Sequence, residues 1–141
     1  NLGIKNYKIN FTEKGAIPLF HPLNKNNKKT VYIGSAGGMT RLSTGYTFLN
    51  IQEHSKYIVE NIDKIEKMKM YNIGKKYQFL DKIFLRVLKN NPDKMPKIFF
   101  EMFKASSSCV IKFLSNKSNI FEDINIIGRM PKLIFMRALF Q

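Results

Sequence analysis

The sequence predicts an α/β fold: a few strands, then a glycine-rich loop, a long helix and an all-helical tail. Near the amino terminus apolar residues alternate with polar ones, which is the period of a strand. Four glycines then fall within Gly34–Gly45. Beyond residue 70, apolar residues recur every three or four positions, which is the period of an amphipathic helix. We therefore expect two regions: residues 1–70 with the strands, loop and helix, and residues 71–141 with the helical tail.

Three short strands are expected before the glycines. Tyr7, Ile9 and Phe11 alternate with polar residues, so one face of this segment is apolar and the other polar. Ala16–Phe20 follows a turn-like Glu-Lys-Gly sequence and is expected to return as a second strand. The next residues are rich in Asn and Lys and indicate a loop. Thr30–Ile33 is β-branched and aromatic and is expected to form the third strand.

One long helix is expected after the glycine-rich loop, from about Thr44 to Ile62, with a weaker continuation toward Met70. Ser43 or Thr44 is the expected cap, because a hydroxyl there can accept a hydrogen bond from an amide of the first turn. His54 falls on the polar face of this helix, so we expect its side chain to be exposed to solvent.

The tail has the pattern of a series of amphipathic helices from Tyr77 onward. The first carries apolar residues on one side and places Asp81 among the polar residues opposite. It is expected to end at Asn90-Asn91-Pro92, since the residue before a proline disfavours the helical region. The later helices are expected to begin at Pro96 and to cover Cys109–Leu114, Ile120–Ile127 and Lys132–Phe140.

Length and charge bound the class of protein. The chain has 141 residues, enough for one ordinary domain, and a formal net charge of +14. Such a charge occurs on proteins that bind nucleic acid or an anionic membrane. It also arises where an AT-rich genome fills tolerant surface positions with Lys and Asn, and all three explanations stay open. The start at Asn1, followed at once by strand-like sequence, indicates a carboxy-terminal fragment of a longer protein.

Few residues are candidates for metal or nucleophilic chemistry. Cys109 is the only cysteine, which excludes an intrachain disulfide and a multi-cysteine zinc site, and we expect a buried, inert thiol. His21 and His54 are too few and too far apart in sequence for a metal site. His21 is either a loop residue or part of an active-site cleft. No paired carboxylates and no nucleophile–base set are found, so no catalytic or metal-binding residue is assigned.

The order of strand, glycine-rich turn and helix start has a physical use. Amides at the amino end of a helix have no partners inside the helix, and the aligned peptide dipoles place about half a positive charge there. An anion or an electron-rich ring edge is stabilised at that end, and glycines let the backbone approach it closely. The spacing is neither GxGxxG nor that of a phosphate loop. From spacing alone, a ligand site and a plain tight turn both remain open.

The stretch Thr30–Tyr46 resembles the second flavin-contacting motif of the glutathione-reductase-like flavoproteins. That motif is a strand ending in Gly-Asp-Ala-Ala/Gly, a short loop usually containing Pro, then Thr-Gly and a helix. The amino-acid sequence of this stretch most resembles that of the lycopene β-cyclases. The segments Lys14–Leu19 and Lys132–Leu139 resemble the same family. Two positions depart from the motif: Ser35 stands where an acid usually holds a ribityl hydroxyl, and Leu42 stands where a Pro is common.

The resemblance implies the carboxy-terminal part of a Rossmann-like FAD-binding fold. It implies an enzyme that closes the ends of lycopene into β-ionone rings, a non-redox isomerisation that needs reduced FAD, with NADPH or NADH as the reductant. The catalytic acid would lie upstream, so we expect this fragment to be inactive alone. The implied cofactor contacts, with Tyr46 also directed toward the substrate cavity, are Gly34, Ser35, Ala36, Gly37, Gly38, Met39, Ser43, Thr44, Gly45 and Tyr46.

The resemblance also implies partners and a location. A linear carotenoid such as lycopene dissolves in lipid, so we expect a cytoplasmic protein held peripherally at the inner face of the membrane, without nucleic acid. Phe and Lys at helical spacing in the tail suit a membrane interface, although Phe99, Phe103 and Leu114 also suit a core. Two alternatives remain: a related FAD-dependent monooxygenase or prenyl-lipid reductase, and a basic helical module that binds membrane or nucleic acid without a cofactor.

Overall fold

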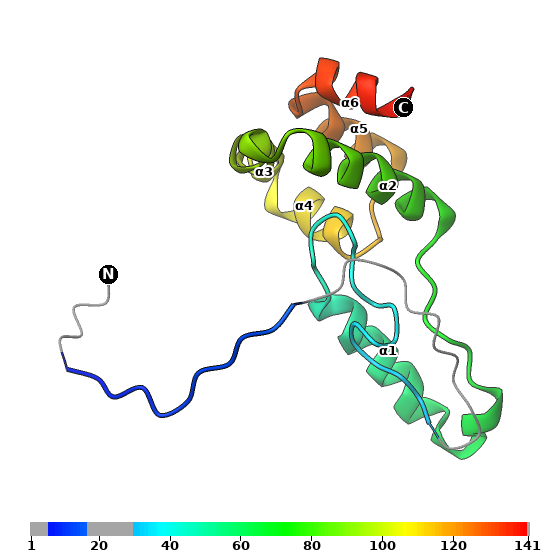
Figure 1. Cartoon of the computed structure of the whole chain (residues 1–141). Helices are drawn as coiled ribbons and strands as arrows, with labels where there is room; N and C mark the ends of the chain where they lie inside the picture. Colours follow the sequence, from blue (N-terminus) through cyan, green and yellow to red (C-terminus); the bar gives the residue numbers. More distant parts are fainter. Residues whose placement is uncertain (1–5, 17–29, 141) are drawn as a thin grey trace.

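A computed structural model describes residues 6–16 and 30–140. Within these ranges the chain forms α-helices and short 3-10 helices joined by turns and extended segments (Figure 1). In chain order the elements are α1 (Phe48–Glu60), η1 (Ile62–Lys67), α2 (Lys75–Asn90), η2 (Pro92–Lys94), α3 (Met95–Phe103), α4 (Ser107–Leu114), α5 (Ile120–Arg129) and α6 (Lys132–Leu139).

The predicted strands, and with them the α/β Rossmann-like fold class, are wrong for the described part of the chain, which is helical and contains no sheet. Residues 6–16 are extended, yet Tyr7, Ile9 and Phe11 are exposed and the segment runs away from the helices (Figure 1). Alternation predicts extended backbone, but a strand also needs a neighbour to pair with its amides and carbonyls. Thr30 makes only an isolated bridge, and Ala16–Phe20 lies outside the described residues from position 17 onward.

Helix α1 is shorter than predicted at its amino end. It begins at Phe48, because residues 41–46 close on themselves through a hydrogen bond from the Arg41 amide to the Tyr46 carbonyl (2.9 Å). It ends at Glu60, where the side chain of Asn61 donates to the carbonyl of Tyr57 (2.8 Å) and competes with the next backbone bond. The expected continuation toward Met70 is the 3-10 helix η1.

The predicted helical tail is confirmed. Helix α2 ends at Asn90, directly before Asn91-Pro92 as expected, and packs against α6. Local signals start the later helices: the Ser106 hydroxyl accepts from the Cys109 amide (3.3 Å), and Asn119 forms a capping box with Glu122. These helices gather at one end of the molecule, above α1 in Figure 1.

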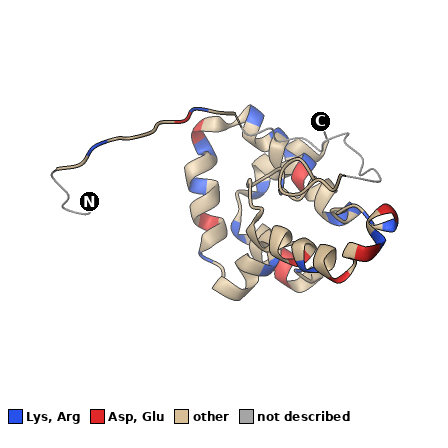
Figure 2. Cartoon of the chain, turned by 90° about the horizontal axis from the view of Figure 1, so that it is seen from below, with Lys and Arg blue, Asp and Glu red and all other residues tan. Residues whose placement is uncertain are grey.

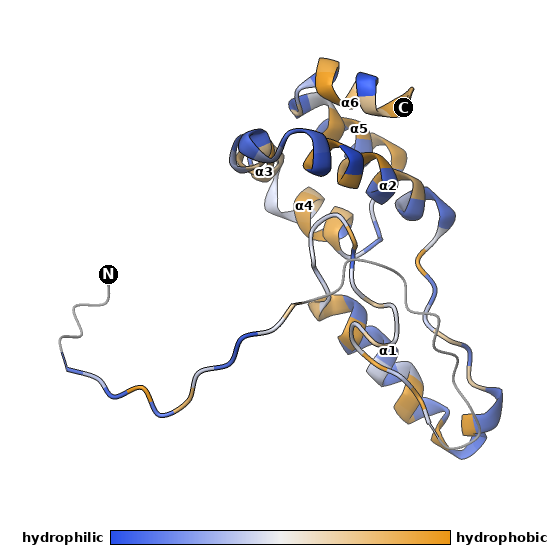
Figure 3. Ribbon diagram, viewed as in Figure 1, coloured by the Kyte–Doolittle hydropathy of each residue, from blue (hydrophilic) through white to orange (hydrophobic). Residues whose placement is uncertain are grey.

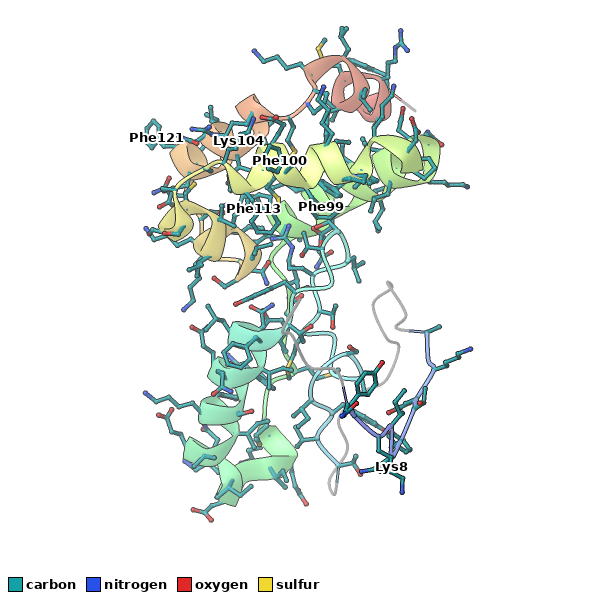
Figure 4. The ribbon with its side chains drawn as sticks, turned by 90° about the vertical axis from the view of Figure 1, so that its left-hand side faces the viewer. Lys8, Phe99, Phe100, Lys104, Phe113 and Phe121 are labelled. Carbon is teal, nitrogen blue, oxygen red and sulfur yellow. The ribbon has the colours of Figure 1, made fainter. Side chains whose placement is uncertain are left out.

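The core of the tail lies between α2, α3, α4, α5 and α6. Its fully or almost fully buried members are Ile83, Phe84, Val87, Met95, Ile98, Met102, Ala105, Cys109, Val110, Phe113, Leu114, Ile126, Met130 and Ala138. The tail's phenylalanines divide between core and surface. Phe99 packs against Phe84 at 5.5 Å between ring centroids and Leu114 is buried, whereas Phe103 is exposed. Figure 3 shows apolar residues along the helices of the tail, and some of them, such as Phe100 and Phe121 in Figure 4, are exposed.

Replacing Ile98 with Ala tests this core. Ile98 is fully buried on α3, so Ile98→Ala should lower the free energy of unfolding by about 2–5 kcal/mol through lost burial and a residual cavity. Phe100→Ala on the same helix is the matched control, and because Phe100 is exposed we expect a change within about 0.5 kcal/mol. Urea unfolding followed by circular dichroism measures both, and equal losses would contradict the assigned core.

Candidate functional site

The glycine-rich segment is a tight turn held by its own backbone. The Gly37 amide donates to the carbonyls of Ile33 (3.2 Å) and Gly34 (3.1 Å), the Gly38 amide to Ser35 (3.1 Å), and the Met39 amide to Gly34 (3.0 Å). Gly34 and Gly38 have φ angles of 63° and 73°, the left-handed region that glycine adopts without strain. Three amides of the segment are therefore already engaged inside the turn.

Gly37 has no room for a side chain. A Cβ built on it would lie 2.4 Å from the carbonyl oxygen of Tyr32, so this glycine is required by the fold of the turn itself. On the other side, Gly37 and Gly38 border a groove of about 260 Å³ whose remaining walls are residues 70–73 and Gln78. The turn thus presents bare backbone to a groove of mixed polarity.

A row of hydroxyls runs from the glycine turn to the start of α1. The Ser35 and Thr40 hydroxyl oxygens are 2.9 Å apart, and those of Thr40 and Thr47 are 3.2 Å apart. The Thr47 hydroxyl donates to the carbonyl of Gly45 (3.0 Å). These contacts join both halves of the predicted cofactor segment through Thr40 and Thr47, neither of which is among the predicted contacts.

The predicted cap of α1 is wrong. Thr47 occupies the cap position, and no side chain accepts from the first turn of the helix. The Ser43 hydroxyl instead donates to Asp81 (2.6 Å), and the Thr44 hydroxyl accepts from the Tyr46 amide (3.3 Å). The amino end of α1 consequently keeps amides that no side chain satisfies, an arrangement that favours a negative charge placed before it.

The ten predicted cofactor residues have very different exposure. Ser35, Ala36 and Gly45 are exposed, and Thr44 is half-buried. Met39 and Ser43 are buried, so contact with a ligand would be limited to their backbone. Tyr46 is half-buried and packs against the core of the tail.

The polar centre that anchors this segment is not predicted by the sequence pattern. Arg41 is the only charged residue in Gly34–Tyr46, and its side chain is 1% exposed. It forms a buried ion pair of 2.6 Å with Asp81 of α2, which had been assigned to the polar face of its helix. Asn50 of α1 is also buried and donates to the Met39 carbonyl (2.8 Å). A lone arginine within a segment of small residues was the available signal.

His54 is buried rather than exposed, which corrects the prediction for its helix. Its ring is 7% exposed and lies 5.5 Å from the Tyr57 ring and 5.7 Å from the Tyr71 ring. Burial lowers the pKa of His54 below its ordinary value, because the charged imidazolium loses hydration. Burial likewise raises the pKa of Tyr71, and the Asn116 amide that donates to its hydroxyl (3.1 Å) opposes that effect.

The remaining candidates offer no further chemistry. Cys109 is buried, as predicted, and burial raises the pKa of its thiol, which keeps it protonated and unreactive. His21 lies outside the described residues. Over residues 6–16 and 30–140, no group of His, Cys, Asp and Glu side chains has the arrangement of a metal site. Over the same ranges, no helix is long and apolar enough to cross a membrane.

Comparison with known families places this helical chain and its glycine turn among the enzymes of carotenoid cyclisation. The family described as "Lycopene cyclase protein" matches residues 1–140. The chain therefore belongs to the lycopene cyclase family, which confirms the resemblance drawn from the glycine-rich segment. Comparisons with curated proteins and with solved structures found no significant match.

The buried His54 predicts a pH-dependent stability. Because its folded-state pKa lies below the ordinary value of 6.5, the unfolded chain binds more protons as the pH falls from about 7. The free energy of unfolding should therefore decrease as the pH falls below about 7. His54→Phe keeps an aromatic ring against the two tyrosines and should flatten that decrease. Urea unfolding at each pH measures it, and identical pH profiles for variant and parent would refute the assignment.

Proposed function

We propose that this chain is part of an FAD-dependent cyclase that converts the ends of lycopene into β-ionone rings. The match to the lycopene cyclase family over residues 1–140 carries the proposal. The glycine turn supports the flavin part of it because Gly37 and Gly38 border a groove, and the uncapped start of α1 adds a partial positive charge in the same segment of the chain. We keep the two predicted regions, residues 1–70 with the cofactor site and residues 71–141 with the helical tail.

The residues of the turn suggest how a flavin would be held. Ser35 and Ala36 are exposed and would contact the ribityl and pyrophosphate portion, and Thr44, Gly45 and the first turn of α1 would hold the ring end. Reduced FAD, kept reduced by NADPH or NADH, would supply negative charge that stabilises a cation forming on the substrate. The amino end of α1 favours that negative charge through its dipole and its amides.

Gly45 offers a test of the cofactor site. Its φ of 72° is strained for any other residue, although an added Cβ would meet nothing within 4 Å. Gly45→Ala should shift the loop and weaken FAD binding on the order of tenfold. Gly128→Ala is the matched control, because a Cβ there also meets open space and the residue lies on α5, away from the loop. Flavin fluorescence titration of the full-length protein measures both, and equal affinities would refute the assigned loop.

The reaction itself is tested in cells that accumulate lycopene. Expression of the full-length protein should convert the red polyene into products with β-ionone rings, identified by chromatography and mass spectrometry. Unchanged lycopene together with bound flavin would favour a monooxygenase or prenyl-lipid reductase of the same superfamily. A purified protein without flavin, whose binding to anionic ligands falls steeply with salt, would favour the cofactor-free binding module.

We propose further that the tail holds the protein at the cytoplasmic face of the membrane, where a linear carotenoid is dissolved. Exposed apolar side chains follow one side of α5 and continue on α6: Ile120, Phe121, Ile124, Ile127, Leu133, Met136 and Leu139. No acidic residue occurs from Ile124 to Gln141, while Arg129, Lys132 and Arg137 do. Figure 2 shows Lys and Arg spread over the helices, and each basic residue near anionic lipid adds about 1 kcal/mol.

Vesicle binding tests the proposed membrane surface. Phe121 is 79% exposed and projects from the edge of the tail in Figure 4, so its replacement should leave the fold intact. Phe121→Ser combined with Ile124→Ser should reduce sedimentation with phosphatidylglycerol-containing vesicles on the order of tenfold or more, through lost apolar burial. Val59→Ser, an exposed apolar position on α1, is the control. Equal vesicle binding by the double variant and the control would exclude this surface. Binding of the parent protein to duplex DNA as strong as its binding to vesicles would favour nucleic acid as the partner.

A further inference from the structure

The Arg41 side chain joins the loop to two helices of the tail. Its Nε and Nη2 donate to the Asp81 carboxylate on α2 at 3.0 and 2.6 Å. Its Nη1 donates to the Phe113 carbonyl at the end of α4 (2.7 Å) and to the Asn116 side chain (3.1 Å). The rings of Tyr77 and Phe113 lie 4.9 and 5.0 Å from the guanidinium carbon. The planar guanidinium is therefore fixed by hydrogen bonds at its edge and by aromatic rings against it.

Asp81 accepts hydrogen bonds from three consecutive residues of the loop. Besides the guanidinium, its carboxylate accepts from the Leu42 amide (3.1 Å) and from the Ser43 hydroxyl (2.6 Å). Both ionic side chains are 1% exposed, so water does not share these contacts. One carboxylate of the tail thus fixes the direction in which the chain leaves Arg41.

The backbone of Arg41 closes the same loop. Its amide donates to the Tyr46 carbonyl (2.9 Å), and its carbonyl accepts from the amides of Thr44 (3.3 Å) and Gly45 (2.7 Å). On the preceding side, the Asn50 side chain ties Met39 to α1 (2.8 Å). Arg41 is thus anchored in the tail by its side chain and defines the shape of residues 41–46 by its backbone.

A purely structural role does not explain this arrangement well. A buried ion pair is often no more stabilising than apolar residues of similar volume, so its value lies in fixing geometry. Residues 40–47 are mostly small and polar, so apart from Tyr46, which packs against the core of the tail, their contacts are largely hydrogen bonds. The direction of the loop after Arg41 therefore depends on the contacts of this pair, while Asn50 and the ion pair between Glu53 and Lys117 also hold α1.

We infer that Arg41 and Asp81 are positioning residues, which hold loop 41–46 and the start of α1 in the geometry needed to bind the cofactor. The inference rests on the proposed flavin site, because it states what keeps that site in place. It also makes a claim independent of flavin: without the pair, the loop loses its defined position while the tail keeps its fold.

The test replaces both members of the pair. Arg41→Met combined with Asp81→Leu removes the charges without leaving one unpaired. The matched control is Lys104→Met combined with Glu101→Leu, since that ion pair (2.8 Å) lies at the end of α3 and has no contact with Arg41 or Asp81. Two quantities are measured on the full-length protein well below its unfolding temperature: amide hydrogen exchange across residues 42–50, and the dissociation constant for FAD.

The loop variant should exchange the amides of residues 42–46 at least tenfold faster and bind FAD at least tenfold more weakly, with exchange in α3 to α5 unchanged. The control variant should leave both quantities at parent values. Unchanged loop exchange, or the same changes in the control, would overturn the inference. If the loop variant does not fold, Arg41→Lys is measured instead. This substitution keeps the positive charge but removes the planar guanidinium, so hydrogen exchange equal to that of the parent would overturn the inference. A parent protein without flavin would refute the proposed function, while the exchange data still decide the positioning role.

Discussion

The buried contact between Arg41 and Asp81 is the interaction on which the arrangement of this protein depends. It connects the helical tail to the glycine turn and its loop, which are stabilised in different ways. The tail has an apolar core of its own, made by residues such as Val87 and Ile98. The glycine turn and its loop bury few apolar side chains, chiefly Met39 and part of Tyr46. Hydrogen bonds to a charged group therefore do much to set their position, because the hydrophobic effect has little surface to act on.

The sequence predicts those elements that are determined locally. The tail helices follow from apolar spacing, and the end of α2 follows from Pro92, since both signals act within a few residues. The glycine turn was also identified correctly, and three of its glycines adopt positive φ angles. The amino-acid sequence of the same segment also indicated the family, because a short motif consists of residues adjacent in sequence.

Elements that depend on distant partners could not be predicted in this way. An alternating segment forms a strand only beside another strand, and none of the described residues provides one for Tyr7–Phe11. Asp81 looks like a surface residue by its helical position until Arg41, forty residues earlier, is known to lie against it. His54 is covered by Tyr57 on its own helix and by Tyr71 beyond η1. In each case the missing information is which segments meet in space.

The hydroxyl row beside the glycine turn fixes the direction of its protons. The Gly45 carbonyl can only accept, so Thr47 donates to it and must accept from Thr40. Thr40 has one proton, which goes to Thr47, so it accepts in turn from Ser35. The proton of Ser35 is thereby committed inward, and its exposed oxygen is left with lone pairs facing outward. A ligand hydroxyl arriving there would meet an acceptor, which is the hydrogen-bond polarity that a carboxylate would offer at the same position.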